Sequence, residues 1–268
     1  MREIEKAALP RVLFSDEALY GLPEQGLRGV AEFAAQYDGS LRVVVYLRRQ
    51  DDHLVSHYQQ VVKVGETRRL VERIQQADYS NIHDYYARLR SWGQQAQPDG
   101  LVVRRFEPDQ FAGGSLHQDF FEAAEIRGLE CGFEQLPSRN QSLGAEAVEF
   151  LRILNLLRKQ DPSAAALTAG NHDIIGRLGL LDDGPSLTAP GALLDEVMSR
   201  WSASNAAVAH EFIQDGESLF RKPRKTRNTT TEQYFDPDRL DDYVTLLELP
   251  EQVTKPLRTL VEREARGG

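Results

Sequence analysis

The chain has 268 residues, of which 41% are hydrophobic and 27% charged, and its formal net charge is −9 at pH 7. Such a composition is typical of a soluble globular protein, and the acidic balance argues against general nucleic-acid binding. A single cysteine, Cys131, excludes an intrachain disulfide and a metal site built from cysteines. The first residues lack the apolar stretch of a signal peptide, and no run approaches membrane-spanning length. We therefore expect a cytoplasmic protein with neither a membrane nor a nucleic acid as partner.

Three short, apolar and β-branched segments predict buried parallel strands, at residues 11–15, 41–47 and 101–106. Apolar residues at helical spacing predict helices between them, at residues 23–37, 51–64, 67–77 and 81–95. Strands that alternate with helices are typical of a parallel sheet with right-handed crossovers.

The second half of the chain has a helical pattern. Helices are predicted at residues 116–126, 143–159, 191–214 and 252–266, with Ser142 as an N-cap. The polar residues 221–242 between the last two predict a mobile loop. The whole chain, 1–268, is therefore expected to be a single α/β domain, with a short parallel sheet flanked by helices and a helical C-terminal half.

The histidines show no metal-ligand spacing, and two asparagines are expected to be structural. His53 and His57 lie four positions apart, but no third ligand is evident, so we expect no metal site. Asn155 and Asn205 fall among apolar helical positions, where an asparagine normally satisfies neighbouring polar groups.

Arg48 and Ser56 are the most informative pair in the sequence. Arg48 follows the predicted strand 41–47, and Ser56 lies about one turn inside the next helix. A guanidinium, a hydroxyl and the N–H groups of a helix start are groups with which proteins bind phosphate. In open parallel sheets, ligands bind beyond the carboxyl ends of the strands. The alternative is that Arg48 pairs with Asp51 or Asp52 and that Ser56 is solvated.

The pattern Arg48-x-x-x-Asp52-x-x-x-Ser56 resembles the 3′-phosphate-binding segment of sulfotransferases that use 3′-phosphoadenosine 5′-phosphosulfate (PAPS). The run Tyr-Leu-Arg-Arg-Gln-Asp at 46–51 is similar to bacterial members of that family. Further similar stretches, in the same order, are Val103–Glu107, Asp119–Ile126, Asn140-x-Ser142, Leu154-Asn155 and Ser204-Asn205. The resemblance covers most of residues 10 to 220. It implies a P-loop-type fold and the transfer of a sulfuryl group from PAPS to a hydroxyl of a saccharide or another small metabolite.

The resemblance also implies roles for individual residues. Arg48 and Ser56 would bind the 3′-phosphate of PAPS. The base that takes the proton of the acceptor hydroxyl would follow the first predicted strand, where we favour Glu17 over Asp16. The residues alone also allow another interpretation, in which Ser15 or Asp16 is a helix N-cap and Glu17 interacts with the helix dipole.

Two further sets of basic residues are candidates for PAPS binding. Arg104 and Arg105 end the third predicted strand and should point to opposite faces, so that one faces the ligand and the other is packed. An ion pair with Glu107 is the alternative for either arginine. A basic run lies late in the chain, where cytosolic sulfotransferases have a 3′-phosphate-binding segment; it consists of Lys222, Arg224, Lys225 and Arg227. It lacks their Arg-Lys-Gly pattern, and a solvated charged face is its alternative.

One element of the family is missing from the sequence. Sulfotransferases hold the 5′-phosphosulfate with a loop of the Lys-x-Gly-Thr-Thr kind, and none precedes Arg11. We therefore expect either a reading frame that begins further upstream or a natural remnant. Two other functions stay open: a non-catalytic remnant that binds a nucleotide or a partner protein, and a glycosyltransferase-like enzyme in which Arg48 binds a phosphate of another donor.

Overall fold

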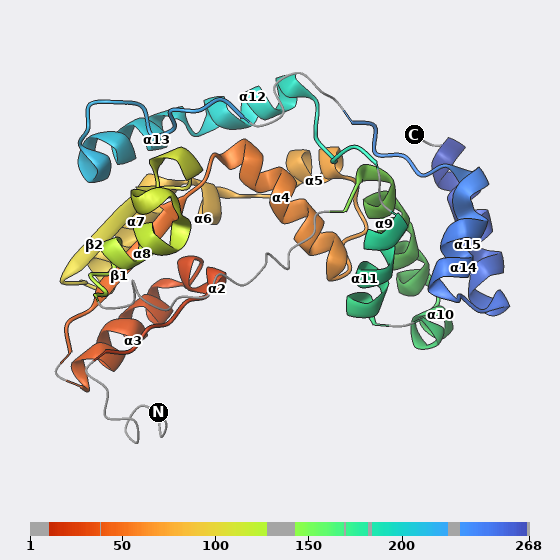
Figure 1. Cartoon of the computed structure of the whole chain (residues 1–268), viewed down its shortest axis with the longest axis horizontal. Helices are drawn as coiled ribbons and strands as arrows, with labels where there is room; N and C mark the ends of the chain where they lie inside the picture. Colours follow the sequence, from red (N-terminus) through yellow and green to blue (C-terminus); the bar gives the residue numbers. More distant parts are fainter. Residues whose placement is uncertain are drawn as a thin grey trace. The chain divides into compact units, whose positions relative to one another are not determined.

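The computed structural model describes residues 11–37, 39–127, 143–168, 170–181, 184–224 and 231–266 (Figure 1). The chain forms two compact units, and each is described by itself. Unit 1 consists of Met1–Leu47, Tyr79–Arg127 and Ala203–Leu219. Unit 2 consists of Arg48–Asp78, Gly128–Ser202 and Phe220–Gly268. The expectation of a single domain stays a prediction.

Unit 1 is built on a two-stranded parallel sheet, formed by β1 (Arg42–Leu47) and β2 (Gly100–Arg105). Arg42 lies opposite Gly100 and Leu47 opposite Arg105. β1 has the sequence Arg-Val-Val-Val-Tyr-Leu, and such β-branched and aromatic side chains fit a pleated, half-buried surface. Two of the three predicted strands are thus confirmed.

Short helices surround this sheet in unit 1. They are α2 (Glu17–Tyr20), α3 (Glu24–Ala35), α6 (Ser80–His83), α7 (Tyr85–Gln95), α8 (Leu116–Ala123) and, apart from its first residue, α13 (Ser202–Val208). Three single turns complete the unit: η1 (Pro108–Gln110), η2 (Ala112–Gly114) and the π-helical η3 (Ala209–Ile213).

Helices cover both faces of the sheet in unit 1. On one face, Val43 packs against Leu27 of α3 and Trp92 of α7. On the other face, the Tyr46 hydroxyl donates a hydrogen bond to Asp119 of α8. A parallel sheet normally buries both faces in this way, and the expected α/β class with helices flanking a short parallel sheet is confirmed.

The predicted strand at residues 11–15 is wrong. This segment has no regular secondary structure, and Val12, Leu13 and Phe14 are 47%, 58% and 59% exposed. Apolar, β-branched residues form a strand only when a neighbouring strand pairs with their backbone, and within the described residues the sheet consists of β1 and β2. Phe14 instead packs edge-on against Phe33 of α3, with ring centroids 5.7 Å apart.

Unit 2 is helical, as expected for the second half of the chain. Its helices are α4 (Gln50–Lys63), α5 (Leu70–Gln76), α9 (Ala145–Gln160), α10 (Pro162–Leu167), α11 (Asn171–Leu181), α12 (Gly191–Arg200), α14 (Leu240–Leu247) and α15 (Glu251–Arg266), with the single turn η4 (Pro237–Arg239). The core of the unit lies along α9, where Phe150, Leu151 and Leu154 are fully buried. Phe150 packs on Phe235 and Tyr243, at centroid distances of 5.3 Å and 4.7 Å.

Several helices differ from their prediction. The predicted helix 81–95 is divided at Asp84, because the Asp84 carboxylate caps α7 by accepting the Ala87 N–H at 3.1 Å. The predicted helix 191–214 is divided at Trp201 and ends in the π-helical turn η3. The short helices α10, α11 and α14 were not predicted from the sequence. The predicted N-cap Ser142 lies outside the described residues, as does Cys131.

The predicted mobile loop at 221–242 is partly described. Residues 225–230 lie outside the described part, whereas Phe235 and Leu240 on their C-terminal side are buried at 2% and 1% exposure. η4 and the start of α14 also fall within this segment. The mobility of the segment stays a prediction.

A buried ionic network joins the helices of unit 2. The Arg152 guanidinium donates to both Glu149 carboxylate oxygens, at 2.7 Å and 2.6 Å, and to Glu264 of α15 at 2.7 Å. It also donates to the Thr67 carbonyl at 2.9 Å, and the Gln233 amide donates to Glu149 at 2.8 Å. Both members of the Glu149–Arg152 pair are almost fully buried. The pair therefore connects α9, α15, the start of α5 and the segment that contains Gln233.

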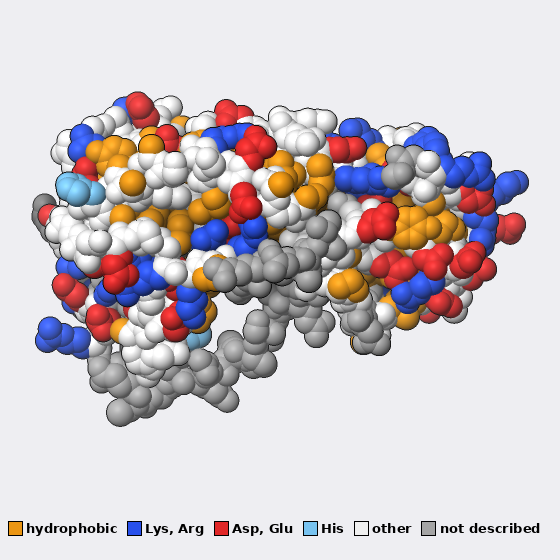
Figure 2. Space-filling view, turned by 90° about the horizontal axis from the view of Figure 1, so that it is seen from above, with side chains coloured by type: hydrophobic (Ala, Val, Ile, Leu, Met, Phe, Trp, Pro, Cys, Tyr) orange, Lys and Arg blue, Asp and Glu red, His pale blue; other side chains and the backbone are white. Residues whose placement is uncertain are grey.

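The described surface is mixed in charge. On the face seen in Figure 2, acidic and basic side chains are interspersed with apolar ones. Among the described ranges, no helix has both the length and the apolar character that a bilayer span requires.

Loss of one member of the buried pair should destabilise unit 2. In an Arg152→Met variant, the Glu149 carboxylate loses its main counter-charge, and we expect the free energy of unfolding to fall by about 3–5 kcal/mol. Urea denaturation followed by helical circular dichroism measures this loss. Arg200→Met is the matched control, because Arg200 forms an exposed pair with Glu196, and it should cost less than about 1 kcal/mol. Equal losses of unfolding free energy in the two variants would show that the buried pair stabilises the protein no more than the exposed pair does.

Candidate functional site

The start of α4 has the local structure that the sequence predicted. β1 ends at Leu47, Arg48 follows, and α4 begins at Gln50 with Arg49 at its N-cap position. Ser56 lies in the second turn of α4, and both Arg48 and Ser56 are half-buried. Arg48 thus follows the carboxyl end of a parallel strand and precedes the first turn of a helix, where backbone N–H groups have no partner within the helix.

The first turn of α4 contains a buried carboxylate, that of Asp51, whose side chain is 0% exposed. Arg49 donates to both of its oxygens, from Nε at 3.2 Å and from Nη2 at 2.9 Å. Nη1 of Arg224 lies 3.8 Å from Oδ2 of Asp51 and 2.8 Å from Oδ1 of Asp195 on α12. One buried carboxylate therefore holds two guanidinium groups at the start of the helix.

A segment far along the chain meets α4 at this point. Nη1 of Arg49 donates to the Lys222 carbonyl at 3.0 Å, and the two residues are 173 positions apart. Within unit 2, the late basic segment and the first turn of α4 are therefore in contact. Of the predicted residues, Arg224 contacts the first turn of α4, Arg48 lies two residues before that helix, and Ser56 lies in its second turn. Lys225 and Arg227 of the same basic run lie outside the described residues.

His53 and His57 form a stacked pair on α4, with ring centroids 5.4 Å apart and an interplanar angle of 12°. Burial, together with the smaller effects of the neighbouring His57 and Arg48 charges, lowers the pKa of His53 to about 4. Arg48 therefore acts electrostatically on α4, and His53 is neutral at pH 7. Within the described ranges, no three His, Cys, Asp or Glu side chains are grouped so as to hold a metal ion.

The candidate base residues lie in unit 1, at the start of α2. Asp16 is the N-cap of this helix, and its carboxylate accepts the Ala18 N–H at 2.7 Å. Glu17 is in the first turn, and both acidic side chains are exposed. The structure thus has the capping arrangement that the sequence allowed as an alternative. The role of Glu17 as a base stays a prediction, and the capping contact of Asp16 favours Glu17 over it.

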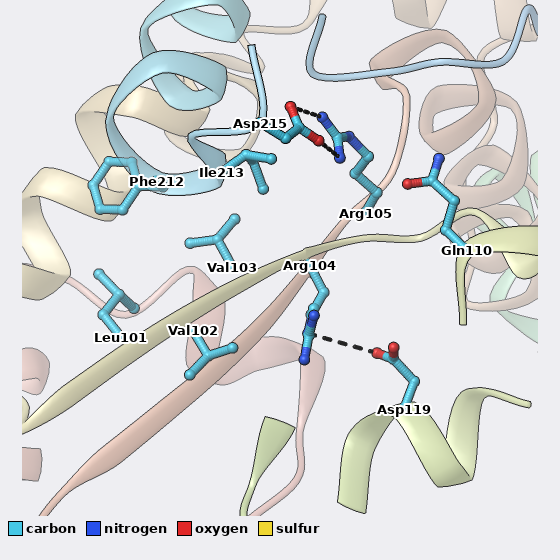
Figure 3. Close-up of a pocket in the computed structure, with 10 residues that line it drawn as sticks. All are labelled: Leu101, Val102, Val103, Arg104, Arg105, Gln110, Asp119, Phe212, Ile213 and Asp215. Carbon is cyan, nitrogen blue, oxygen red and sulfur yellow. Dashed lines mark hydrogen bonds and ion pairs between the residues drawn. The ribbon is translucent and has the colours of Figure 1, made fainter. Parts of the chain in front are cut away.

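Arg105 is packed inside unit 1 (Figure 3). It is 8% exposed, and it binds Asp215 through two hydrogen bonds of 2.6 Å and 3.0 Å. Its remaining hydrogen bonds go to the Leu219 carbonyl at 2.7 Å and the Ser218 carbonyl at 3.1 Å. These contacts favour the packed alternative for Arg105 over the predicted cofactor contact.

Arg104 points to the opposite face of β2, as Figure 3 shows, so the predicted alternation is confirmed. Its guanidinium lies 3.9 Å from Asp119 and 3.2 Å from Glu122, both on α8, and its side chain is 37% exposed. The acidic partners of both arginines come from elements packed on the two faces of the sheet, because strand side chains point toward those elements. Glu107, the expected partner, accepts a hydrogen bond from Gln110.

A pocket of about 470 Å³ lies along β2 in unit 1 (Figure 3). Its lining consists of Leu101, Val102, Val103, Arg104, Arg105, Gln110, Asp119, Phe212, Ile213 and Asp215. Residues from both faces of β2 contribute to it, so it follows the strand edge that β1 does not occupy. Its charged side chains pair with one another, Arg105 with Asp215 and Arg104 with Asp119.

Comparison with known proteins finds one similar stretch. Over 85 residues, 32% of this chain, the sequence is 34% identical to an uncharacterized protein of Archaeoglobus fulgidus. The match spans 22% of that protein. No family model matches the chain, and no solved structure matches it.

Of the acidic residues at these sites, the sequence named Asp51 only as a possible partner of Arg48, and it did not identify Asp195 or Asp215. Asp51 and Asp195 bind Arg224, and Asp215 binds Arg105. The spacing of Arg49 and Asp51 at a helix start was a usable signal for the first of them. Asp195 and Asp215 carry no such signal, because their arginine partners come from distant parts of the chain.

The pKa of His53 gives a prediction for pH dependence. Below pH 6.5, the ordinary value for histidine, the unfolded chain binds a proton at this position, whereas the folded chain binds it only near pH 4. The free energy of unfolding should therefore fall as the pH drops from 6.5 to 4, and this contribution should not change below pH 4. Imidazole chemical shifts in NMR spectra measure the midpoint directly. Arg48→Met should raise the midpoint of the His53 titration, because the positive charge of Arg48 is one of the causes that lower the pKa of His53. A midpoint near 6.5 in the wild-type chain would contradict the burial of His53.

The two arginines of β2 should differ in their importance for stability. Arg105→Met should lower the free energy of unfolding by about 3 kcal/mol, because it removes the counter-charge of Asp215 and the guanidinium hydrogen bonds to two carbonyls. Arg104→Met, at the exposed pair, should cost less than about 1 kcal/mol. Denaturation curves of the two variants make the comparison. If Arg105→Met instead reduced PAPS binding at unchanged stability, Arg105 would be a ligand residue.

Proposed function

We propose that this chain binds PAPS with the start of α4 and belongs to a sulfotransferase-like protein that transfers the sulfuryl group to a hydroxyl. The acceptor in this proposal is a saccharide or another small metabolite. Arg48 and Ser56 bind the 3′-phosphate, and Arg224 supplies a further positive charge. The P-loop-type fold of the family is part of the same proposal.

The observation that carries the proposal is the contact between the late basic segment and α4. The sequence alone offered Arg48 and Ser56 on one segment and Arg224 on another, linked only by the resemblance. In unit 2, the Arg224 guanidinium lies 3.8 Å from Asp51, in the first turn of the helix that contains Ser56. If the basic run were simply a solvated surface segment, there would be no reason for Arg224 to lie next to the first turn of α4.

The chemistry of this region suits a phosphate dianion. A helix start presents backbone N–H groups and the positive end of the helix dipole, and arginine binds phosphate through parallel hydrogen bonds. Arg48, Arg49 and Arg224 contribute three positive charges near α4, and the carboxylates of Asp51 and Asp52 in its first turn and of Asp195 on α12 offset them. Because His53 is neutral at pH 7, it does not add to the charge that the phosphate compensates.

In the transfer step, the acceptor hydroxyl oxygen forms a bond to sulfur while the bond from sulfur to the 5′-phosphate oxygen breaks. 3′-Phosphoadenosine 5′-phosphate (PAP) leaves with the electron pair of that bond. Glu17 takes the proton of the hydroxyl in this proposal. Binding of the 3′-phosphate and transfer of the sulfuryl group are separate claims, and they are tested separately.

Calorimetric titration with PAP tests the binding claim. Arg48→Ala should weaken binding by about tenfold to a hundredfold, because it removes a charge-assisted hydrogen bond to the phosphate. Ser56→Ala should weaken it by about fivefold, as expected for a hydroxyl donor. Arg258→Ala is the matched control, since Arg258 is an exposed arginine of α15 in the same unit, paired with Asp241. Unchanged PAP affinity in both the Arg48 and the Ser56 variant would reject the assignment.

A second titration separates the alternatives. A nucleotide-sugar that bound more tightly than PAP, and did so through Arg48, would favour a glycosyltransferase-like enzyme. PAP binding without transfer of sulfate from PAPS to a panel of saccharides would favour a non-catalytic nucleotide-binding protein. Transfer that Glu17→Gln leaves unchanged would instead reject Glu17 as the base.

A further inference from the structure

We propose that Asp51 and Asp195 have opposite effects on ligand binding through one arginine, Arg224. Asp51 is a positioning residue that keeps Arg224 at the start of α4. Asp195 competes with the ligand phosphate for the same guanidinium. This inference rests on the proposed function, since it concerns how the 3′-phosphate site of PAPS is organised.

Arg224 lies between two carboxylates that differ in their access to water. Its side chain is 11% exposed, and its Nη1 atom lies 2.8 Å from Asp195 and 3.8 Å from Asp51. The Asp51 side chain is 0% exposed, whereas that of Asp195 is 71% exposed. Without a ligand, the exposed carboxylate therefore has the closer contact and the buried one the more distant contact.

This difference in exposure determines which contact breaks when a phosphate arrives. An exposed ion pair contributes little free energy, because water solvates a released carboxylate almost as well as its partner does. A buried carboxylate is not solvated when its partner leaves, so its separation from a guanidinium is costly. A phosphate at the start of α4 should therefore replace Asp195, and not Asp51, as a partner of Arg224.

A second arginine holds Asp51 and the backbone of the late segment in place. Arg49 binds both oxygens of Asp51, at 3.2 Å and 2.9 Å, and also donates to the Lys222 carbonyl at 3.0 Å. The backbone two residues before Arg224 is thereby attached to α4, while the Arg224 side chain is held by carboxylates alone among its described contacts. The guanidinium can therefore change partner without movement of the segment that carries it.

PAP affinities of two variants test the proposal, because their expected effects have opposite sign. Asp195→Asn should tighten PAP binding by about threefold, as it removes the competing carboxylate. Asp51→Asn should weaken binding by about tenfold, as Arg224 and Arg49 lose the charge that keeps them at α4. Glu196→Gln is the matched control: it removes the same charge from the neighbouring position of α12, where Glu196 pairs with Arg200, and it should leave the affinity within about 1.5-fold.

The same variants in an Arg224→Met background separate positioning from a general effect on structure. If both residues act through Arg224, the gain from Asp195→Asn should disappear in that background, and most of the loss from Asp51→Asn should disappear with it. An Asp51→Asn loss of the same size with and without Arg224 would show that Asp51 only supports the fold. Helical circular dichroism checks that each variant is folded. Should the Asp51 variant unfold, the Asp195 variant still tests the competition for Arg224, because Asp195 is exposed.

The outcomes distinguish this inference from the proposed function. Absence of PAP binding to the wild-type chain would overturn both. PAP binding that depends on Arg48, together with an Asp195→Asn affinity no tighter than that of Glu196→Gln, would leave the proposed function in place and overturn the inference alone.

Discussion

The packing of α9 against α4 is the constraint on which the candidate site depends. Inside unit 2, the Asn155 amide of α9 donates to the Val62 carbonyl of α4 at 2.7 Å. The Gln233 amide joins Glu149 of α9 to the Tyr58 hydroxyl of α4, at 2.8 Å and 2.7 Å. The side chains that fix the direction of α4 are thus polar groups buried among apolar ones, each with a partner. Because the position of α4 is set from its middle and its C-terminal end, its first turn is available to hold charged groups.

The first turn of α4 is unusual in having a buried acid between two arginines. A helix start favours acidic residues on electrostatic grounds alone, and Asp51 satisfies that preference. Here the acid also neutralises part of the positive charge that gathers at this end of the helix, so that Arg49 and Arg224 can approach one another. The guanidinium groups of Arg49 and Arg224 thus lie around the single buried carboxylate of Asp51.

The sequence predicted those features that depend on local order along the chain. The strand 41–47, the turn at Arg48 and the helix that follows were all found, because alternating patterns and side-chain type determine them. The structural role of Asn155 was also foreseen, and its buried amide does bind backbone carbonyls. The predicted strand 11–15 was wrong because strand formation depends on a partner, which no local pattern reveals. For the same reason, the ion pairs of Arg105 and Arg224 with residues of other segments could not be predicted.

The unpaired segment before α2 also has a consequence for the behaviour of the protein in solution. Val12, Leu13 and Phe14 are consecutive apolar residues, each about half exposed, and they belong to the same unit as a sheet that has two strands within the described residues. Exposed β-forming residues and bare strand edges are the features through which separate molecules add to one another's sheets. Concentrated samples will therefore tend to self-associate through unit 1. A charged substitution at Leu13 is the simplest way to improve solubility without alteration of any helix described in unit 2.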